Sequence, residues 1–453
     1  PWERNVALTR MGVTAGAQIA AHEFANLFRG RASRNASDRT FYAAQARHLA
    51  AELGKLKGSV MKVGQMLSLY GQYFLPPEAV EVLASLHDDT PPVAWGALEP
   101  VLRRGLGRAL MNELDIDREP LASASLGQVH RARRKADGFE LVLKVQYPGV
   151  ADAIESDIRT LSRLIAMTRV APRGLNLDPV YLEVREMLHR EVDYAAEIEH
   201  TRRFGERLKG DPRYVVPQVL ERYCSDQVLA LSYEPGVSAR DRSIRALPQE
   251  RRNGLALASL ELFLRELFEW GMVQTDPNFG NYKIRANGGQ TTISAGNGGL
   301  SPVVHPVVQD RIVLLDFGAT RMFGRGFVQS YREMVHGAMV RDRAEVLRGA
   351  EGIGAMRADF PESVHTTFAE LCELIVEPFR GSYDWGASDL PRRVGEKIAR
   401  NALTRYFRIP PREIVFLHRR LAGVFFLAAA LGAKGDVRDV LMRHLDAAPA
   451  YTS

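Results

Sequence analysis

The sequence predicts an α+β protein with two lobes and a helical N-terminal extension. Its 453 residues exceed the roughly 250–300 at which one hydrophobic core stops growing. The first hundred residues show helical periodicity, short strand-like runs follow from about residue 118, and helical patterns return after residue 325. We therefore expect a helical extension over 1–117, a first lobe over 118–234 and a second lobe over 235–453.

Composition narrows the class of protein only mildly. A hydrophobic content of 46% and a charged content of 25% are typical of soluble globular chains. A net charge of +6 suits an anionic ligand or an anionic membrane surface, although a solvated basic surface explains it equally well. The two cysteines, Cys224 and Cys372, are far apart, which argues against a disulfide framework and favours a reducing compartment.

One apolar run raises the question of a membrane span. It covers residues 421–433, between Arg420 and Lys434, and is shorter than the roughly twenty residues that a spanning helix needs. We expect a buried helix of the second lobe instead.

The N-terminal extension is predicted to contain a long amphipathic helix. Ser37 is a suitable N-cap, and apolar residues recur at intervals of three and four positions. Lys62 and Gln65 share one side of this helix and could simply be a solvated pair. The apolar stripe consists of Leu49, Leu53, Leu56, Val60, Val63 and Leu67.

Two segments of the first lobe have strand character. Small residues over 122–130 predict a tight strand–turn–strand, and 141–146 reads as a strand with Lys144 inside an apolar run. A lysine there either extends from an edge strand or pairs with a charge. Phosphate binding would give it a reason to be held inside.

The next segments connect the two lobes. Residues 178–204 read as helical and carry Glu191, Asp193 and Glu197, which could equally be a solvated acidic face. The strand 228–233 ends at Pro235-Gly236, which we interpret as the connector between lobes.

The strongest functional signal lies in the second lobe. Gln274-Thr-Asp-Pro-Asn-Phe-Gly-Asn281 reads as a polar loop, and Ile312-Val-Leu-Leu-Asp-Phe-Gly318 as a buried strand ending in an acid. Asp276, Asn281 and Asp316 thus have the layout of a protein-kinase-like phosphoryl-transfer site. Carboxylate and amide oxygens suit Mg²⁺, a small hard cation. The Gly-rich residues 286–310 between these segments read as a hairpin excursion.

Several motifs in a fixed order resemble the ABC1/UbiB family of atypical kinases over nearly the whole chain. The family's Lys-x-Gly-Gln motif matches Lys62-Val-Gly-Gln65, and its Ala-rich loop matches Ala122-Ser-Ala-Ser-Leu-Gly-Gln-Val-His130. Its nucleotide lysine matches Lys144, its Glu-x-Asp motif matches Glu191 and Asp193, and its ion-pairing glutamate matches Glu197. The run Leu315-Asp-Phe-Gly-Ala-Thr-Arg321 is most similar to the coenzyme Q branch.

The resemblance implies a bilobal protein-kinase-like fold that binds ATP or ADP with Mg²⁺. Lys144 would contact phosphate oxygens, oriented by Glu197, and Asp276 would orient or deprotonate the attacking hydroxyl or water. Asn281 and Asp316 would bind the metal. Lys62 and Gln65, with Glu191 and Asp193, would form a regulatory motif in the cleft. The remaining nucleotide-binding residues would be Ala122, Ser123, Ala124, Ser125, Ser232 and Tyr233.

The sequence also departs from the family pattern. The usual His-Ala-Asp-Pro-His-Pro-Gly-Asn is Gln274-Thr-Asp-Pro-Asn-Phe-Gly-Asn281, which keeps the acid and the amide but loses both histidines. Ser232 stands where an acidic connector residue is expected, and no Gly-x-Gly-x-x-Gly loop is present. Side chains in place of glycines restrict the approach of backbone amides to phosphates, so nucleotide preference is expected to differ from that of ordinary kinases.

The function implied is that of an ATPase or small-molecule kinase supporting ubiquinone biosynthesis. Partners would be isoprenoid or quinone-precursor lipids and ubiquinone-biosynthesis enzymes, with no nucleic acid. The location implied is cytoplasmic, peripheral at the inner membrane. Arg29, Arg31 and Arg34, or Arg202-Arg203, could contact anionic lipid, or they could be plain solvated arginines. Two alternatives remain open, a nucleotide-gated lipid- or protein-binding scaffold without turnover and a protein kinase.

Overall fold

The computed structural model describes residues 92–124, 126–168, 178–286, 310–402 and 410–447. These residues form two compact units, each described here by itself. The first contains the described residues up to Ala196 together with Leu220–Leu231, and the second contains Glu197–Val219 and the described residues from Ser232 onward. The amphipathic helix with Lys62 and Gln65, and most of the excursion at 286–310, lie outside the described residues.

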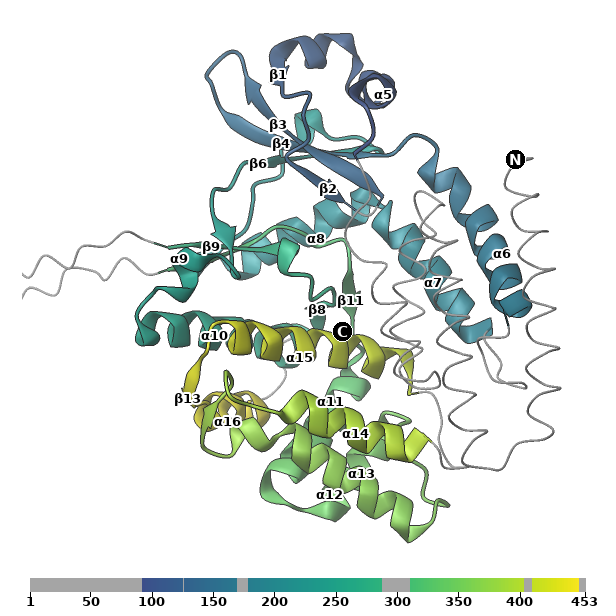
Figure 1. The fold of residues 1–453 in the computed structure, drawn as a ribbon, viewed down its shortest axis with the longest axis vertical. Helices are drawn as coiled ribbons and strands as arrows, with labels where there is room; N and C mark the ends of the chain where they lie inside the picture. Colours follow the sequence, from purple (N-terminus) through teal and green to yellow (C-terminus); the bar gives the residue numbers. More distant parts are fainter. Residues whose placement is uncertain (1–91, 125, 169–177, 287–309, 403–409, 448–453) are drawn as a thin grey trace, which may run out of the picture. The chain divides into compact units, whose positions relative to one another are not determined.

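The first unit is built on a sheet with strand order β1-β3-β4-β6, in which β1, β2 and β4 all pair antiparallel with β3 (Figure 1). Helices complete the unit. Its elements are α5 (Trp95–Glu113), β1 (Leu114–Ile116), β2 (Ala122–Ala124), β3 (Gly127–Arg134), β4 (Glu140–Gln146), α6 (Val150–Thr168), α7 (Asp178–Glu191), the start of α8 (Tyr194–Arg207) and most of β6 (Val228–Ser232).

The two predicted strand segments of this unit are confirmed. β2 and β3 pair with Ala124 opposite Gly127, which gives the tight turn expected from the small residues. A Cβ at Gly127 would lie 2.3 Å from the carbonyl oxygen of Val145, so the close approach of β4 requires glycine there. On β4, Leu141, Leu143 and Val145 are fully buried, whereas Lys144 projects from the other face and is half-buried.

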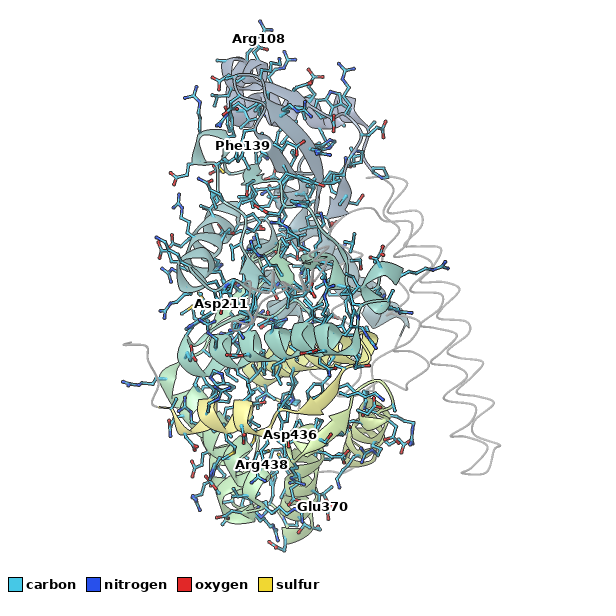
Figure 2. All side chains as sticks on the ribbon, turned by 90° about the vertical axis from the view of Figure 1, so that its left-hand side faces the viewer. Arg108, Phe139, Asp211, Glu370, Asp436 and Arg438 are labelled. Carbon is cyan, nitrogen blue, oxygen red and sulfur yellow. The ribbon has the colours of Figure 1, made fainter. Side chains whose placement is uncertain are left out.

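The turn between β3 and β4 is fixed by side chains. Arg134 bonds to Asp137 at 2.5 Å, and its guanidinium stacks 5.1 Å from the centroid of the Phe139 ring. Phe139 is labelled in Figure 2, which shows all described side chains. The turn therefore holds the β3–β4 register that places Val129 opposite Lys144.

The segment predicted as helical over 178–204 consists of two helices. α7 ends at Glu191 and α8 begins at Tyr194. Oδ1 of Asp193 accepts a hydrogen bond from the backbone N–H of Ala196 at 3.0 Å, which is the geometry of an N-cap. The acid in this motif therefore has a structural role in starting α8, which a helical pattern alone does not reveal.

The second unit is mainly helical. α10 packs along α15, and α11 packs against α12 (Figure 1). Its helices are α9 (Arg242–Arg245), α10 (Gln249–Leu264), a π-helical turn (Arg265–Glu269), α11 (Arg325–Val340), α12 (Arg343–Gly352), α13 (Glu362–Ile375), α14 (Leu390–Ala402), α15 (Arg412–Ala430) and α16 (Arg438–Asp446).

Among the described residues of this unit, short strands form three small sheets. The largest has the order β5-β10-β9-β7, in which β10 is parallel to β5 and antiparallel to β9. β8 pairs with β11, and β12 with β13. The strands are β5 (Tyr214–Val215), β7 (Val237–Ser238), β8 (Met272–Gln274), β9 (Tyr282–Arg285), β10 (Arg311–Leu314), β11 (Thr320–Met322), β12 (Ser382–Asp384) and β13 (Lys434–Asp436).

Most of the apolar run at 421–433 forms the second half of α15, which ends at Ala430, as expected. Leu421, Val424 and Leu427 are buried in the core of the unit, while Phe426 is exposed. No helix among the described residues is long and apolar enough to cross a membrane.

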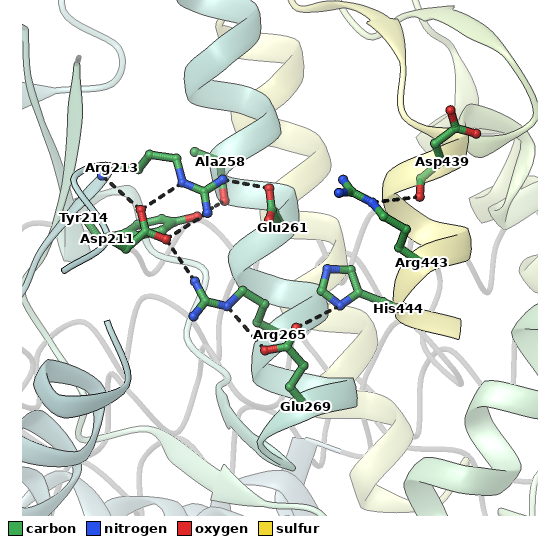
Figure 3. Close-up of polar contacts among 10 residues, drawn as sticks. All are labelled: Asp211, Arg213, Tyr214, Ala258, Glu261, Arg265, Glu269, Asp439, Arg443 and His444. Carbon is green, nitrogen blue, oxygen red and sulfur yellow. Dashed lines mark hydrogen bonds and ion pairs between the residues drawn. The ribbon is translucent and has the colours of Figure 1, made fainter. Parts of the chain in front are cut away.

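A chain of ion pairs connects the segment before β5 to two helices (Figure 3). Arg213 bonds to Asp211 at 2.8 Å and to Glu261 of α10 at 2.7 Å. Arg265 forms ion pairs with both Asp211 and Glu269. Glu269 in turn lies 3.3 Å from Nδ1 of His444 on α16. These contacts hold β5 beside α10 and so support β10, the strand that leads to Asp316.

Candidate functional site

Two ladders of the second unit bring the two predicted motif loops together. Residues 275–281 connect β8 to β9, and residues 315–319 connect β10 to β11; β8 pairs with β11 while β9 pairs with β10. Hydrogen bonds join the loops directly: the N–H and the Oγ1 of Thr275 both donate to the carbonyl of Ala319, and the N–H of Leu315 donates to the carbonyl of Asn281. Gln274, the last residue of β8, adds a bond from its Nε2 to the carbonyl of Asp316.

Both carboxylate oxygens of Asp276 are engaged. Oδ1 accepts a hydrogen bond from Arg419 Nη2 at 2.8 Å, and Oδ2 accepts one from Asn281 Nδ2 at 3.1 Å. The backbone N–H of Asp276 donates to Gln274 Oε1 at 3.0 Å. The acid is thus held from its backbone and from both oxygens, with Arg419 contributed by α15.

Asn281 ends a 3₁₀ turn (Phe279–Asn281) that begins at Asn278. Oδ1 of Asn278 accepts from the N–H of Gly280, and the guanidinium of Arg240 lies 4.3 Å from the centroid of the Phe279 ring. Because Nδ2 of Asn281 faces Asp276, its amide oxygen is directed away from that carboxylate. An amide oxygen is the part of asparagine that binds Mg²⁺.

The Asp316-Phe-Gly turn is anchored by its middle residue. The Phe317 ring is buried and lies 4.6 Å, centroid to centroid, from Phe204 on α8. Oδ1 of Asp316 accepts from the N–H of Gly318 at 2.9 Å. A methyl group at Gly318 would lie 3.2 Å from Oε2 of Glu197 and 3.4 Å from Oδ1 of Asp316, so both carboxylates lie next to this glycine.

A buried ion pair lies behind the Asp276 loop. Arg420, which follows Arg419 on α15, is 3.3 Å from Glu266, and the two side chains are only 2% and 1% exposed. Arg420 also donates to the hydroxyl of Tyr282, the residue after Asn281. Burial raises the pKa of Glu266 to about 7, although Arg420 favours its charged form. Glu266 belongs to the π-helical turn, a feature that is frequent at functional sites.

The connector after β6 is stabilised by an acid that the sequence interpretation did not single out. Glu234 accepts hydrogen bonds from the hydroxyl of Ser232 and from Arg285 Nη2 on β9. Ser232 itself is buried and accepts from the N–H of Gln218. Lys283 Nζ lies 5.6 Å from the centroid of the Tyr233 ring, and burial lowers the pKa of its ammonium.

In the first unit, β4 presents two polar side chains to the start of α8. Lys144 Nζ lies 5.4 Å from the centroid of the Tyr194 ring, and Gln146 Nε2 donates to the carbonyl of Val192 at 2.6 Å. Glu197 lies one helical turn beyond Tyr194 on α8 but belongs to the second unit. The Lys144–Glu197 ion pair therefore stays a prediction.

Comparison with known families decides the class of protein. The model of the ABC1 atypical kinase-like domain matches residues 85–350, more than half of the chain. The chain belongs to the ABC1 family.

Curated relatives agree with this assignment. The chain is 32% identical to the mitochondrial atypical kinase COQ8B of Rattus norvegicus over 88% of its length, and 31% identical to the mitochondrial atypical kinase COQ8 of Saccharomyces cerevisiae over 84%. It spans 71% and 72% of those two proteins, and 60% of the 32% identical COQ8 of Schizosaccharomyces pombe, which matches 85% of the chain. The family resemblance inferred from the sequence is therefore confirmed.

A solved structure supports the fold. The complex of Rv3197 with erythromycin from Mycobacterium tuberculosis matches 90% of this chain and 97% of its own, with a TM-score of 0.59 and 25% sequence identity. The expected mixed helix-and-strand, kinase-like fold is confirmed for this ABC1 domain.

The residues predicted for the Ala-rich loop are only partly described. Ala122, Ser123 and Ala124 form β2, whereas Ser125 lies outside the described residues.

The polar side chains of the two motif loops include the oxygen donors that Mg²⁺ prefers. Within the ranges that the structure describes, no three His, Cys, Asp or Glu side chains converge on a metal-sized site. Asn281 directly precedes β9 and Asp316 follows the paired strand β10, and the N–H of Leu315 bonds to the carbonyl of Asn281. Mg²⁺ usually takes only one or two protein carboxylates and completes its shell with phosphate oxygens and water, so these two residues fit it.

Two further residues of the site escaped the sequence interpretation. Arg419 and Arg420 stand at the start of the apolar run of α15, where they read as the polar end of a core helix. The paired basic residues are the only sequence signal, and nothing local connects them to Asp276. Glu234 was missed because the acid was sought two residues earlier, at Ser232.

Proposed function

We propose that this ABC1 protein binds a Mg²⁺–nucleotide, ATP or ADP, and transfers or hydrolyses the terminal phosphoryl group. The observation that carries the proposal is the joining of the 275–281 and 315–319 loops, which sets Asp276, Asn281 and Asp316 on one rigid framework. Phosphoryl transfer depends on positioning and charge stabilisation more than on covalent chemistry, so a rigid framework suits it.

Each residue has a role in this proposal. Asn281 and Asp316 hold Mg²⁺, which would neutralise charge developing on the phosphate oxygens. Asp276 orients or deprotonates the attacking hydroxyl or water. Lys144 binds phosphate oxygens and is oriented by Glu197, whose carboxylate next to Gly318 is close to the metal-binding turn.

The acceptor is proposed to be water or a small molecule in ubiquinone biosynthesis. The named relatives are atypical kinases of mitochondria, and the Rv3197 structure holds erythromycin, a small molecule. A cleft in which Lys62, Gln65, Glu191 and Asp193 limit access would disfavour a protein substrate. We place the protein peripherally at the cytoplasmic side of the inner membrane, with isoprenoid or quinone-precursor lipids and biosynthetic enzymes as partners. Arg203 is a weaker lipid contact than expected because it pairs with Glu199 at 2.7 Å.

One observation favours a nucleotide-gated scaffold as second candidate. Arg419 and Asn281 each donate to one oxygen of Asp276, so an attacking hydroxyl or water has to compete with two existing donors for this carboxylate. A protein that remains in this arrangement would bind nucleotide and change its partners without turnover.

Thermal unfolding and phosphate release together test the proposal. A ligand at 100 times its Kd stabilises a protein by about 2.7 kcal/mol, so ADP with Mg²⁺ should raise Tm clearly. Asp316→Asn should abolish the Mg²⁺-dependent part, while Asp439→Asn, at an exposed position of α16, should not. An unchanged Tm of the wild type with Mg²⁺ and ATP or ADP would refute nucleotide binding. A raised Tm without phosphate release, in the presence of quinone-precursor lipids, would favour the scaffold.

A further inference from the structure

Lys283 is a half-buried cation on the central part of the second unit's four-stranded sheet. It follows Asn281 by two residues and lies between Tyr282 and Ile284, both of which point into the core. Side chains alternate between faces along a strand, so Lys283 points to the opposite face. Val313 on β10 and Ser238 on β7 are its register partners on that face.

The connector of residues 233–236 packs directly on Lys283. Its Nζ lies 5.6 Å from the centroid of the Tyr233 ring. A Cβ at Gly236 would lie 2.9 Å from Lys283 Cβ and 3.1 Å from the carbonyl oxygen of Ile284, so glycine is what allows this approach. Lys283 therefore lies beside the connector, near the start of β9, which begins directly after Asn281.

The ammonium of Lys283 has N–H donors that are available to a ligand. In the part of the chain that the structure describes, it forms no hydrogen bond and no ion pair with another residue. The acid of the connector, Glu234, is already bonded by Ser232 and Arg285. The Tyr233 ring attracts the charge, but it satisfies none of the three N–H donors as a hydrogen-bond acceptor would. A partly buried donor without an acceptor is unfavourable, so an acceptor on a ligand would be stabilising.

We propose that Lys283 is a specificity-determining residue that donates a hydrogen bond to the base of the bound nucleotide. The inference rests on the proposed function, in which Asn281 and Asp316 hold the phosphate end through Mg²⁺. Two residues of strand span about 7 Å, so Lys283 lies roughly that far from Asn281 toward the connector. A nucleotide with its phosphates at Asn281 and its base at Tyr233 passes over Lys283.

The chemistry of the bases sets the direction of the selectivity. Guanine presents two adjacent acceptors, O6 and N7, whereas adenine presents N7 next to an amino group that is itself a donor. An ammonium meets two acceptors on guanine but only one acceptor beside a repelling donor on adenine. Lys283 therefore favours guanine nucleotides over adenine nucleotides relative to a neutral side chain at the same position.

Binding measurements with three ligands test this inference. ADP, GDP and inorganic tripolyphosphate, each with Mg²⁺, are titrated calorimetrically into the full chain as wild type, Lys283→Met and Lys283→Arg. We expect Lys283→Met to lower the ratio of GDP to ADP affinity about tenfold, as for loss of one base-specific contact, and Lys283→Arg to retain the ratio. The affinity for tripolyphosphate, which has no base, should stay within a factor of about two. Lys209→Met, the same change at an exposed site of the same unit, is the control.

The other outcomes overturn the inference in distinguishable ways. An unchanged affinity ratio in Lys283→Met shows that Lys283 does not read the base. An equal loss for tripolyphosphate and both nucleotides makes it a phosphate contact instead. Wild-type protein that binds none of the three ligands refutes the proposed function itself, and the inference with it. If Lys283→Met lowers the ligand-free Tm too far, Lys283→Leu, which also offers no hydrogen-bond donor or acceptor, replaces it and the same ratio decides.

Discussion

Arg419 donates a hydrogen bond to Oδ1 of Asp276 at 2.8 Å, across 143 positions of sequence. The two side chains are 23% and 15% exposed, so the pair is partly shielded from water. Together with Asn281 on Oδ2, Arg419 fixes the orientation of the acid. Arg419 is therefore a positioning residue for Asp276, because it would act through that acid and is not proposed to touch the nucleotide.

Replacing Arg419 should separate turnover from nucleotide binding. Arg419→Met removes the donor to Oδ1 and lets the Asp276 carboxylate rotate, so we expect kcat for phosphate release to fall by roughly 10²-fold, the cost of a misplaced reacting group. KM for the nucleotide should change little, because Asn281 and Asp316 keep their places. Steady-state kinetics with Mg²⁺–ATP give both parameters.

Arg419→Lys is the matched variant for this experiment. It keeps the charge but loses the planar fork of donors, so it should recover kcat only in part. A higher kcat in Arg419→Met than in the wild type would mean instead that the Arg419–Asp276 pair is an inhibitory contact that has to open before turnover.

The neighbouring residue Arg420 is predicted to act on stability. Arg420→Met leaves the carboxylate of Glu266 buried without its partner and removes a donor from the Tyr282 hydroxyl. Breaking a buried ion pair from one side costs about 3–5 kcal/mol of unfolding free energy. Urea unfolding at neutral pH measures this loss.

The double variant Glu266→Leu with Arg420→Met distinguishes a paired charge from simple packing. Removing both charges should recover much of the lost stability, because no uncompensated charge remains. If the double variant is as unstable as the sum of the two single variants, the ion pair is not the source of the effect.

Local patterns in the sequence predicted much of the framework, because each pattern is set by nearby residues. The spacing of Asp276 and Asn281, the acid at the end of an apolar strand, and the small residues of the β2–β3 turn all act over fewer than ten positions. The break between α7 and α8 was also within reach, since Asp193 is a good N-cap residue, but a continuous helical period concealed it.

The contacts that were missed join distant segments. Arg419 reaches Asp276 across 143 positions and Arg420 reaches Glu266 across 154. Arginine before an apolar helix is common on any surface, so only the packing of α15 against α10 and the 275–281 loop reveals these two roles. The same holds for Gly318, whose neighbour Glu197 comes from α8.

Replacing Gly127 by any other residue is expected to lower the stability of the protein. Its Cβ would lie 2.3 Å from the carbonyl oxygen of Val145, a backbone atom that cannot move without disturbing the β3–β4 ladder. Overpacking of this kind costs about 1–3 kcal/mol, so Gly127→Ala should lower the unfolding free energy by that amount. Gly96→Ala on α5 is the control, because no atom lies within 4 Å of its added methyl group and alanine favours helix. Equal stability of the two variants would show that β4 relaxes freely around residue 127.

His418, which precedes Arg419 on α15, should make stability depend on pH. Burial lowers the pKa of its imidazole from about 6.5 to about 4, with the ring near Tyr331. Below pH 6.5 the unfolded chain binds a proton at this histidine that the folded protein does not, so stability falls as pH decreases from about 6.5 to 4. At 1.36 kcal/mol per pKa unit the full loss is up to about 3 kcal/mol.

His418→Gln isolates this contribution, because glutamine does not titrate. Urea unfolding at pH 7.5 and pH 5 should show a smaller loss of stability on acidification for His418→Gln than for the wild type. His189→Gln, at a histidine whose side chain is 52% exposed, should keep the wild-type difference. Equal differences for the wild type and His418→Gln would mean that His418 accepts its proton as readily in the folded protein as in the unfolded chain, and that α15 does not bury the ring.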